Sequence, residues 1–130
     1  MRFWLALGSN HQSKAHLDVA CTMLATLGAL ELSSRFETTP RCGYGVNYCN
    51  MAVQLDAAIS VDEMLSEIKR LEALAGRVKP SEIVPLDIDL IAWQDGQTIR
   101  FDPHRLPLAL DVILPMQEIW PDVAVCAGRL

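Results

Sequence analysis

Several features that define other protein classes are missing from this sequence. It has no run of basic residues and carries a net charge of -5, so we expect no nucleic-acid partner. No hydrophobic run is long enough to span a membrane, and the apolar start is too short for a signal peptide, so we expect no membrane association. The 4 cysteines include no Cys-x-x-Cys pair. Zinc spacing is therefore absent, and a free-thiol protein of the cytoplasm is the simplest interpretation.

The composition is that of one globular domain. The chain has 130 residues, of which 51% are hydrophobic and 21% are charged, which allows a substantial core and excludes a disordered protein. No repeat, low-complexity stretch or linker divides it, so residues 1–130 are predicted to form a single domain. Because the chain is acidic, an anionic ligand would need a local cation or a metal ion.

One short stretch alternates strictly between apolar and acidic side chains. Leu86, Ile88 and Leu90 point one way along a predicted strand, and Asp87 and Asp89 point the other. The two carboxylates would lie about 7 Å apart on one face. Mg²⁺ binds one or two protein carboxylates together with phosphate oxygens, so the pair is a candidate metal site. The alternative is an amphipathic strand with two ordinary surface aspartates.

The order of predicted elements defines the fold class. Hydrophobic spacing and turn residues predict a strand at residues 2–7 ended by Gly8-Ser9-Asn10, a helix from Ser13 to a stop at Gly28, and a second strand with Leu30, Leu32 and Phe36 on one side. A loop at 38–47 leads to a strand at 48–57, which is followed by a helix from the capping box Ser60–Glu63 to Gly76. A loop at 77–84, the aspartate strand and an Asp95-Gly96 turn come next. Residues 112–114 are expected to begin a short helix or strand that ends near Pro115. This order predicts an α+β, ferredoxin-like βαββαβ fold, with an antiparallel sheet and two helices on one face.

The same alternation brings polar residues from two strands together. Tyr48 and Asn50 point away from the predicted core face of their strand. They would therefore share the open face of the sheet with Asp87 and Asp89, beneath the long loop at residues 38–47. We expect the two aspartates to face solvent there and to make no core packing.

Short motifs along the chain resemble those of the 6-hydroxymethyl-7,8-dihydropterin pyrophosphokinase family. In order, they are Leu7-Gly8-Ser9-Asn10, Thr39-Pro40 with Gly43, Tyr48-Cys49-Asn50, Arg70-Leu71-Glu72 with Gly76-Arg77, Leu86-Asp87-Ile88-Asp89-Leu90, Pro103-His104, and Pro115 through Pro121. Each motif is short, but their common order covers about the whole chain. The resemblance implies Mg²⁺-dependent transfer of a pyrophosphoryl group from ATP to a reduced pterin.

The resemblance also implies a role for individual residues. Asp87 and Asp89 would hold two Mg²⁺ ions and act in catalysis with Arg77. The implied pterin-binding residues are Thr39, Pro40, Gly43, Tyr48 and Asn50. The implied ATP-binding residues are Glu72, Lys79 and His104.

The sequence also departs from the family pattern. Ile83-Val84-Pro85 stands where the family has Gly-Pro-Arg, and residues 108–112 lack the family's aromatic and basic residues. The loop at 38–47, the loop after Arg77 and the C-terminal tail are also shortened. Arg41, Lys79 or Arg105 could replace a missing cation. Three functions therefore stay open: a pyrophosphokinase, a pterin-binding module or subunit with weakened or lost transfer, and a kinase of another small alcohol.

Overall fold

The computed structural model describes residues 1–78 and 81–128. The elements in chain order are β1 (Arg2–Ser9), α1 (Ser13–Ala25), β2 (Gly28–Leu32), β3 (Phe36–Thr38), β4 (Tyr48–Ala57), α2 (Val61–Leu74), β5 (Asp87–Asp95), β6 (Thr98–Phe101), the 3-10 helix η1 (Pro103–Arg105), α3 (Leu110–Ile119) and α4 (Val123–Gly128). In this part of the chain, no helix combines the length and the apolar character needed to cross a membrane.

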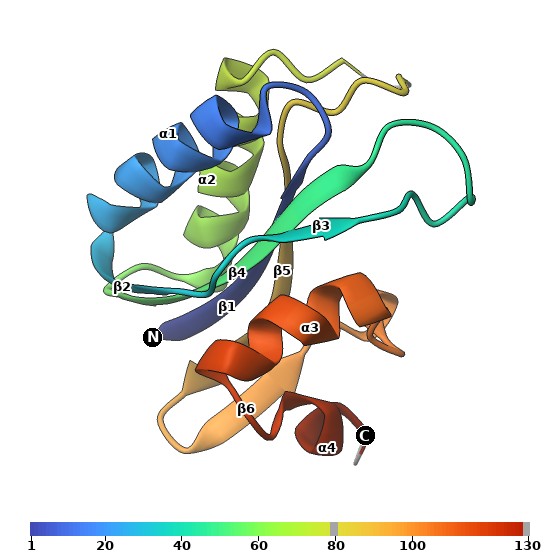
Figure 1. Cartoon of the computed structure of the whole chain (residues 1–130). Coiled ribbons are helices and arrows are strands. Elements are labelled where there is room, and N and C mark those ends of the chain that lie inside the picture. Colours follow the sequence, from blue (N-terminus) through green and yellow to red (C-terminus); the bar gives the residue numbers. More distant parts are fainter. Residues whose placement is uncertain (79–80, 129–130) are drawn as a thin grey trace.

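The strands form one antiparallel sheet in the order β2-β4-β1-β5-β6, and β3 also pairs with β4. Both α1 and α2 lie on one side of this sheet (Figure 1). This arrangement confirms the predicted α+β, ferredoxin-like fold, with β6 and the C-terminal helices as additions. Strand β1 sits between β4 and β5 and therefore places the two strands that carry Asn50 and Asp87 on either side of itself.

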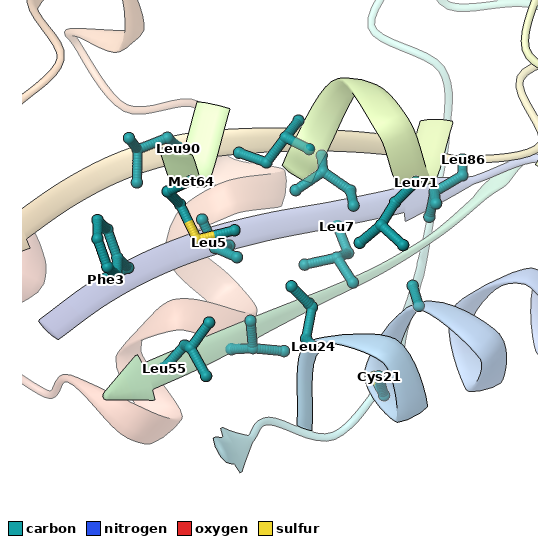
Figure 2. Close-up of a cluster of buried hydrophobic side chains, with 14 of the residues drawn as sticks. Phe3, Leu5, Leu7, Cys21, Leu24, Leu55, Met64, Leu71, Leu86 and Leu90 are labelled. Atoms are coloured by element: carbon teal, nitrogen blue, oxygen red, sulfur yellow. The ribbon is translucent and has the colours of Figure 1, made fainter. Parts of the chain in front are cut away.

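The main hydrophobic core fills the space between the sheet and α1 and α2 (Figure 2). Val53 of β4 and Ile88 of β5 both belong to it, as the alternation in each strand predicted. Leu17 and Leu24 of α1 and Met64 of α2 are fully buried against these strands. The odd-numbered residues of β4 and the even-numbered residues of the first half of β5 thus face the helices, which leaves Asn50 and Asp87 on the other face.

The opposite face of the sheet is only half open, which corrects the expectation of a wholly open face. Helices α3 and α4 cover part of it and enclose a second core (Figure 1). Trp4 of β1 stacks on Trp120, with ring centroids 4.2 Å apart, and Met116 and Val123 are fully buried beside them. The polar residues of β4 and β5 occupy the remaining half of this face.

Two other expectations about strands and helices are wrong. The second strand is interrupted into β2 and β3, because Ser33 pairs through both its backbone and its hydroxyl with the backbone of Ala52. Residues 112–114 do not begin an element that ends at Pro115. Instead, Pro115 lies inside α3 and is buried, so packing offsets its missing backbone donor.

The sequence signals predicted for α2 are confirmed, whereas the predicted end of α1 is wrong. The Ser60–Glu63 capping box of α2 is present, and Gly76 follows that helix with a left-handed φ of 87°. Gly28 is not the stop of α1, which ends at Ala25. It begins β2, and its role is close approach, because a Cβ there would lie 1.9 Å from the Asp56 carbonyl oxygen. The predicted Asp95-Gly96 turn joins β5 to β6.

Candidate functional site

The register of three neighbouring strands aligns the polar residues on the half-open face. Gly8 of β1 pairs with Asn50 of β4 on one side and with Asp87 of β5 on the other. One step along the sheet, Ala6 pairs with Ala52 and with Asp89. An amide and two carboxylates therefore project from the same small area, separated only by a glycine and two alanines.

Gly8 makes this arrangement possible. A Cβ at Gly8 would lie 2.7 Å from the Asn50 side-chain oxygen and 3.7 Å from the Tyr48 ring. Strand β1 runs through Gly8 to Ser9, so this glycine lies within the strand and does not end it as expected. Its missing side chain leaves room for Asn50, whose amide nitrogen donates a hydrogen bond to the Thr38 hydroxyl.

A cleft of about 330 Å³ opens above these residues. Six of the predicted site residues line it, namely Thr39, Pro40, Tyr48, Asn50, Asp87 and Asp89. The other residues that line it are Gly8, Arg41, Cys42 and Asp111. Gly43 belongs to the same loop but is exposed and does not line the cleft. Its φ of 86° shows instead that it shapes the loop.

Arg77 is held at the edge of the cleft between two carboxylates. It forms ion pairs with Asp87 and with Glu72, the latter at 3.1 Å, and only 17% of its side chain is exposed. Glu72 also accepts a hydrogen bond of 2.9 Å from the backbone N–H of Ile88. Glu72, an ATP-binding residue by resemblance, is only 14% exposed and ties this helix to β5.

Asp89 does not face solvent freely, which corrects the expectation for the aspartate pair. Its side chain is 21% exposed and pairs with Arg105 of η1 at 3.1 Å. Burial, and to a lesser extent the nearby Asp87 carboxylate, raises the pKa of the Asp89 carboxyl to about 6. A negative charge on Asp89, in addition to that on Asp87, is therefore unfavourable in the folded protein, and a bound cation would reduce this cost.

The chemistry of the carboxylate pair fits a divalent cation. Asp87 and Asp89 offer hard oxygen donors on one strand face, and each interacts with an arginine, Arg77 and Arg105 respectively. Among the residues that the structure describes, no group of three or more His, Cys, Asp or Glu side chains could hold a metal ion. A cation at this pair would therefore take most of its ligands from water or from a bound anion, as Mg²⁺ commonly does.

A second, smaller cavity of about 140 Å³ adjoins the cleft and shares Arg41 and Asp89 with it. His104 and Arg105 also line this cavity, so His104 shares it with Asp89, one of the two predicted metal ligands. Arg41 forms two hydrogen bonds with Asp111 in the first turn of α3, of 2.9 and 2.7 Å. This contact joins the loop between β3 and β4 to the helix across the cleft.

Some residues of the site could not be identified from sequence spacing. Gly8, Cys42 and Asp111 reach the cleft through strand register, loop path and helix packing, and these do not follow from a local pattern. A glycine inside an apolar strand is the one available signal, since it often marks a close approach of another group. Lys79 lies outside the described residues.

These features define a class of small α+β domain. Its sheet face carries a cleft that is lined by a side-chain amide, a tyrosine ring and two neighbouring carboxylates. The profile of the 7,8-dihydro-6-hydroxymethylpterin-pyrophosphokinase (HPPK) family matches residues 4–124, and the chain belongs to this family. It is also 29% identical over 135 residues to the 2-amino-4-hydroxy-6-hydroxymethyldihydropteridine pyrophosphokinase of Methylorubrum extorquens, an alignment that covers 95% of this chain and 85% of that protein.

Proposed function

We propose that the protein transfers a pyrophosphoryl group from ATP to the hydroxymethyl oxygen of a reduced pterin, in folate-type biosynthesis and with Mg²⁺. The observation that carries this proposal is the row of Asn50, Gly8 and Asp87 across three strands, with Asp89 beside it in the same cleft. Membership of the pyrophosphokinase family supports the same reaction. The four free thiols favour the cytoplasm as its location.

The pterin would occupy the part of the cleft next to Asn50. A pterin has hydrogen-bond donors and acceptors along one edge, and a side-chain amide can match both. The bond from Asn50 to Thr38 fixes the orientation of that amide before the ligand arrives. Tyr48 offers an aromatic surface nearby, while Thr39, Pro40 and Gly43 belong to the loop that would border the ring system.

Asp87 and Asp89 would hold two Mg²⁺ ions together with the oxygens of ATP. Bound there, the ions neutralise negative charge on the phosphates and orient them for an in-line reaction. Arg77 would keep Asp87 in place and contribute positive charge, and Glu72 would position Arg77. His104, in the adjoining cavity, and Lys79 would contact ATP.

The reaction needs positioning and charge neutralisation and no covalent enzyme intermediate. The hydroxymethyl oxygen attacks the β-phosphorus of ATP and forms a new oxygen–phosphorus bond. The bond from the β-phosphorus to the oxygen that bridges to the α-phosphate breaks, so AMP leaves with that oxygen and its electron pair. The hydroxyl proton passes to solvent.

Calorimetric titration of ATP with and without Mg²⁺ tests the metal part of this proposal. The parent protein should bind ATP much more tightly with Mg²⁺, and Asp87→Asn or Asp89→Asn should abolish that dependence. Asp95→Asn, at the exposed end of the same strand, is the matched control and should behave like the parent. A parent without any Mg²⁺-dependent affinity would favour a pterin-binding module, and variants that bind like the parent would show that the aspartates are not metal ligands.

A further inference from the structure

We infer that Arg41 and Arg105 contact the polyphosphate of the bound nucleotide, and that Asp111 competes with the nucleotide for Arg41. This inference rests on the proposed function and extends it, since it names the cations that neutralise ATP on this chain. The two arginines come from the loop between β3 and β4 and from η1, and they meet at the small cavity beside Asp89.

Arg105 pairs with Asp89, so the strength of this pair would depend on whether Asp89 holds a cation. Its guanidinium lies 3.1 Å from Asp89 and 3.8 Å from Asp102, and 44% of its side chain is exposed. A carboxylate whose oxygens hold a divalent cation is a weaker acceptor for a guanidinium group. Arg105 would then be available to phosphate oxygens that share the same cation, without any movement of the backbone.

Arg41 reaches the same place from the other side of the cleft. It lines both the cleft and the small cavity, and 68% of its side chain is exposed although it is paired with Asp111. Asp111, Asp89 and Asp87 line the same cleft as Arg41, and their carboxylates all act to raise the pKa of this guanidinium, with Asp111 having the largest effect. The planar guanidinium group can bind phosphate with two parallel hydrogen bonds, as it now binds Asp111.

The charges around the cleft explain why these two arginines are needed. Asp87, Asp89 and Asp111 bring three negative charges to the cleft, and the protein carries a net charge of -5. Two divalent ions would offset the negative charge that ATP adds, but they would leave the charges of these three aspartates without compensation. No basic residue precedes Asp87 at positions 83–85, so cationic support must come from other elements.

The pair Arg41–Asp111 has a second interpretation, in which Arg41 only ties the loop to α3. The two interpretations predict opposite effects for Asp111→Asn. If Arg41 serves the phosphates, this change removes a competitor and a negative charge, and nucleotide binding tightens. If Arg41 serves only as a tether, the change breaks the tether, and binding weakens as it does in Arg41→Gln.

The test is the affinity for α,β-methylene-ATP with Mg²⁺, measured by calorimetry and repeated with inorganic tripolyphosphate. Arg41→Gln and Arg105→Gln should each weaken both probes about tenfold or more, the usual effect of a lost charge-assisted hydrogen bond. Asp111→Asn should tighten both probes by about threefold or more, because like charge is removed. Arg2→Gln is the matched control, since Arg2 is also ion-paired and half-exposed but lies outside the cleft, and it should leave both affinities within about twofold.

Each outcome decides the inference. If Arg41→Gln and Arg105→Gln bind like Arg2→Gln while the parent binds tightly, the inference is wrong and the proposed function stands. If Asp111→Asn weakens binding as much as Arg41→Gln does, Arg41 is a tether and its assignment fails. If the parent binds neither probe with Mg²⁺, the proposed function and the inference both fail.

Discussion

Asp89 is the residue whose ionisation opposes the fold most clearly. Burial and the neighbouring Asp87 carboxylate raise its pKa from 3.8 to about 6, so above pH 6 the folded protein holds a carboxylate that would be more favourable in the unfolded chain. The cost is on the order of 3 kcal/mol at neutral pH, is lost progressively as pH falls from 6 to 4, and is absent below that range.

We therefore predict that Asp89→Asn stabilises the protein without ligands. The variant should melt at a higher temperature than the parent at pH 8, because the unfavourable charge is gone. The gain should shrink as the pH is lowered and should vanish near pH 4, where Asp89 of the parent is protonated. Thermal melts of both proteins from pH 4 to 8 provide the measurement, and a stability difference that does not change with pH would contradict the placement of Asp89.

Gly8 and Asn50 form a second pair for which single substitutions make clear predictions. Asn50→Ala should weaken pterin binding by roughly 1–3 kcal/mol, because the polar edge of the ring would lose its partner. Gly8→Ala should also weaken it, since the new Cβ would lie 2.7 Å from the Asn50 oxygen and displace that amide. Calorimetry with a reduced pterin measures both effects. Gln54→Ala, on the same face of β4 but outside the cleft, should leave the pterin affinity unchanged.

For single residues, the sequence predicts which face of a strand a side chain occupies, because this depends only on its position among neighbouring residues. Asn50, Asp87 and Asp89 were expected on one face because strand side chains alternate, and they lie there. Their partners were not predictable, since Arg77 and Arg105 reach the aspartates from other elements. The raised pKa of Asp89 also has no sequence signature, because it follows from burial created by the whole fold.

Among the elements, α2 is the one that links the main core to the site. Glu72 on its last turn accepts from the Ile88 backbone and pairs with Arg77, so the position of this helix affects the start of β5. Glu72→Ala should destabilise the protein by about 1–3 kcal/mol, because a half-buried N–H loses its acceptor.

The control for Glu72→Ala lies on the same helix. Glu67 pairs with Arg70 at 2.8 Å on the surface, and such exposed pairs contribute little. Glu67→Ala should therefore change stability by less than about 1 kcal/mol. Urea denaturation of both variants compares them, and equal effects would show that Glu72 is an ordinary surface residue.

Elements were predictable where local signals agree with the tertiary packing. The capping box of α2 and the glycine after it define that helix well, because both act within one turn. The break between β2 and β3 depends on Ser33 bonding to Ala52 of another strand, and helix α3 forms around a buried proline. Both depend on contacts distant in sequence, which hydrophobic spacing does not reveal.

The whole molecule has two cores on opposite faces of one sheet. The core beneath α3 and α4 shares β1, β4 and β5 with the main core. Loss of either core would therefore expose one apolar face of the strands that support the other core. We therefore predict that the chain unfolds as one domain, in a single cooperative transition. Trp93→Phe leaves Trp4 and Trp120 as reporters of the second core, and their fluorescence should change at the same temperature as the far-ultraviolet circular dichroism. An earlier fluorescence transition would show that the C-terminal helices unfold separately.

The most direct test of the account is the product formed from ATP, Mg²⁺ and 6-hydroxymethyl-7,8-dihydropterin. Mass spectrometry of the reaction with purified protein should show the pterin heavier by one pyrophosphoryl group, and AMP in equal amount. Asp87→Asn should form neither product, while Asp95→Asn should form both. Release of ADP with a singly phosphorylated pterin would contradict pyrophosphoryl transfer, and an unchanged pterin under conditions where the parent binds both substrates would show that the cleft binds without catalysing transfer.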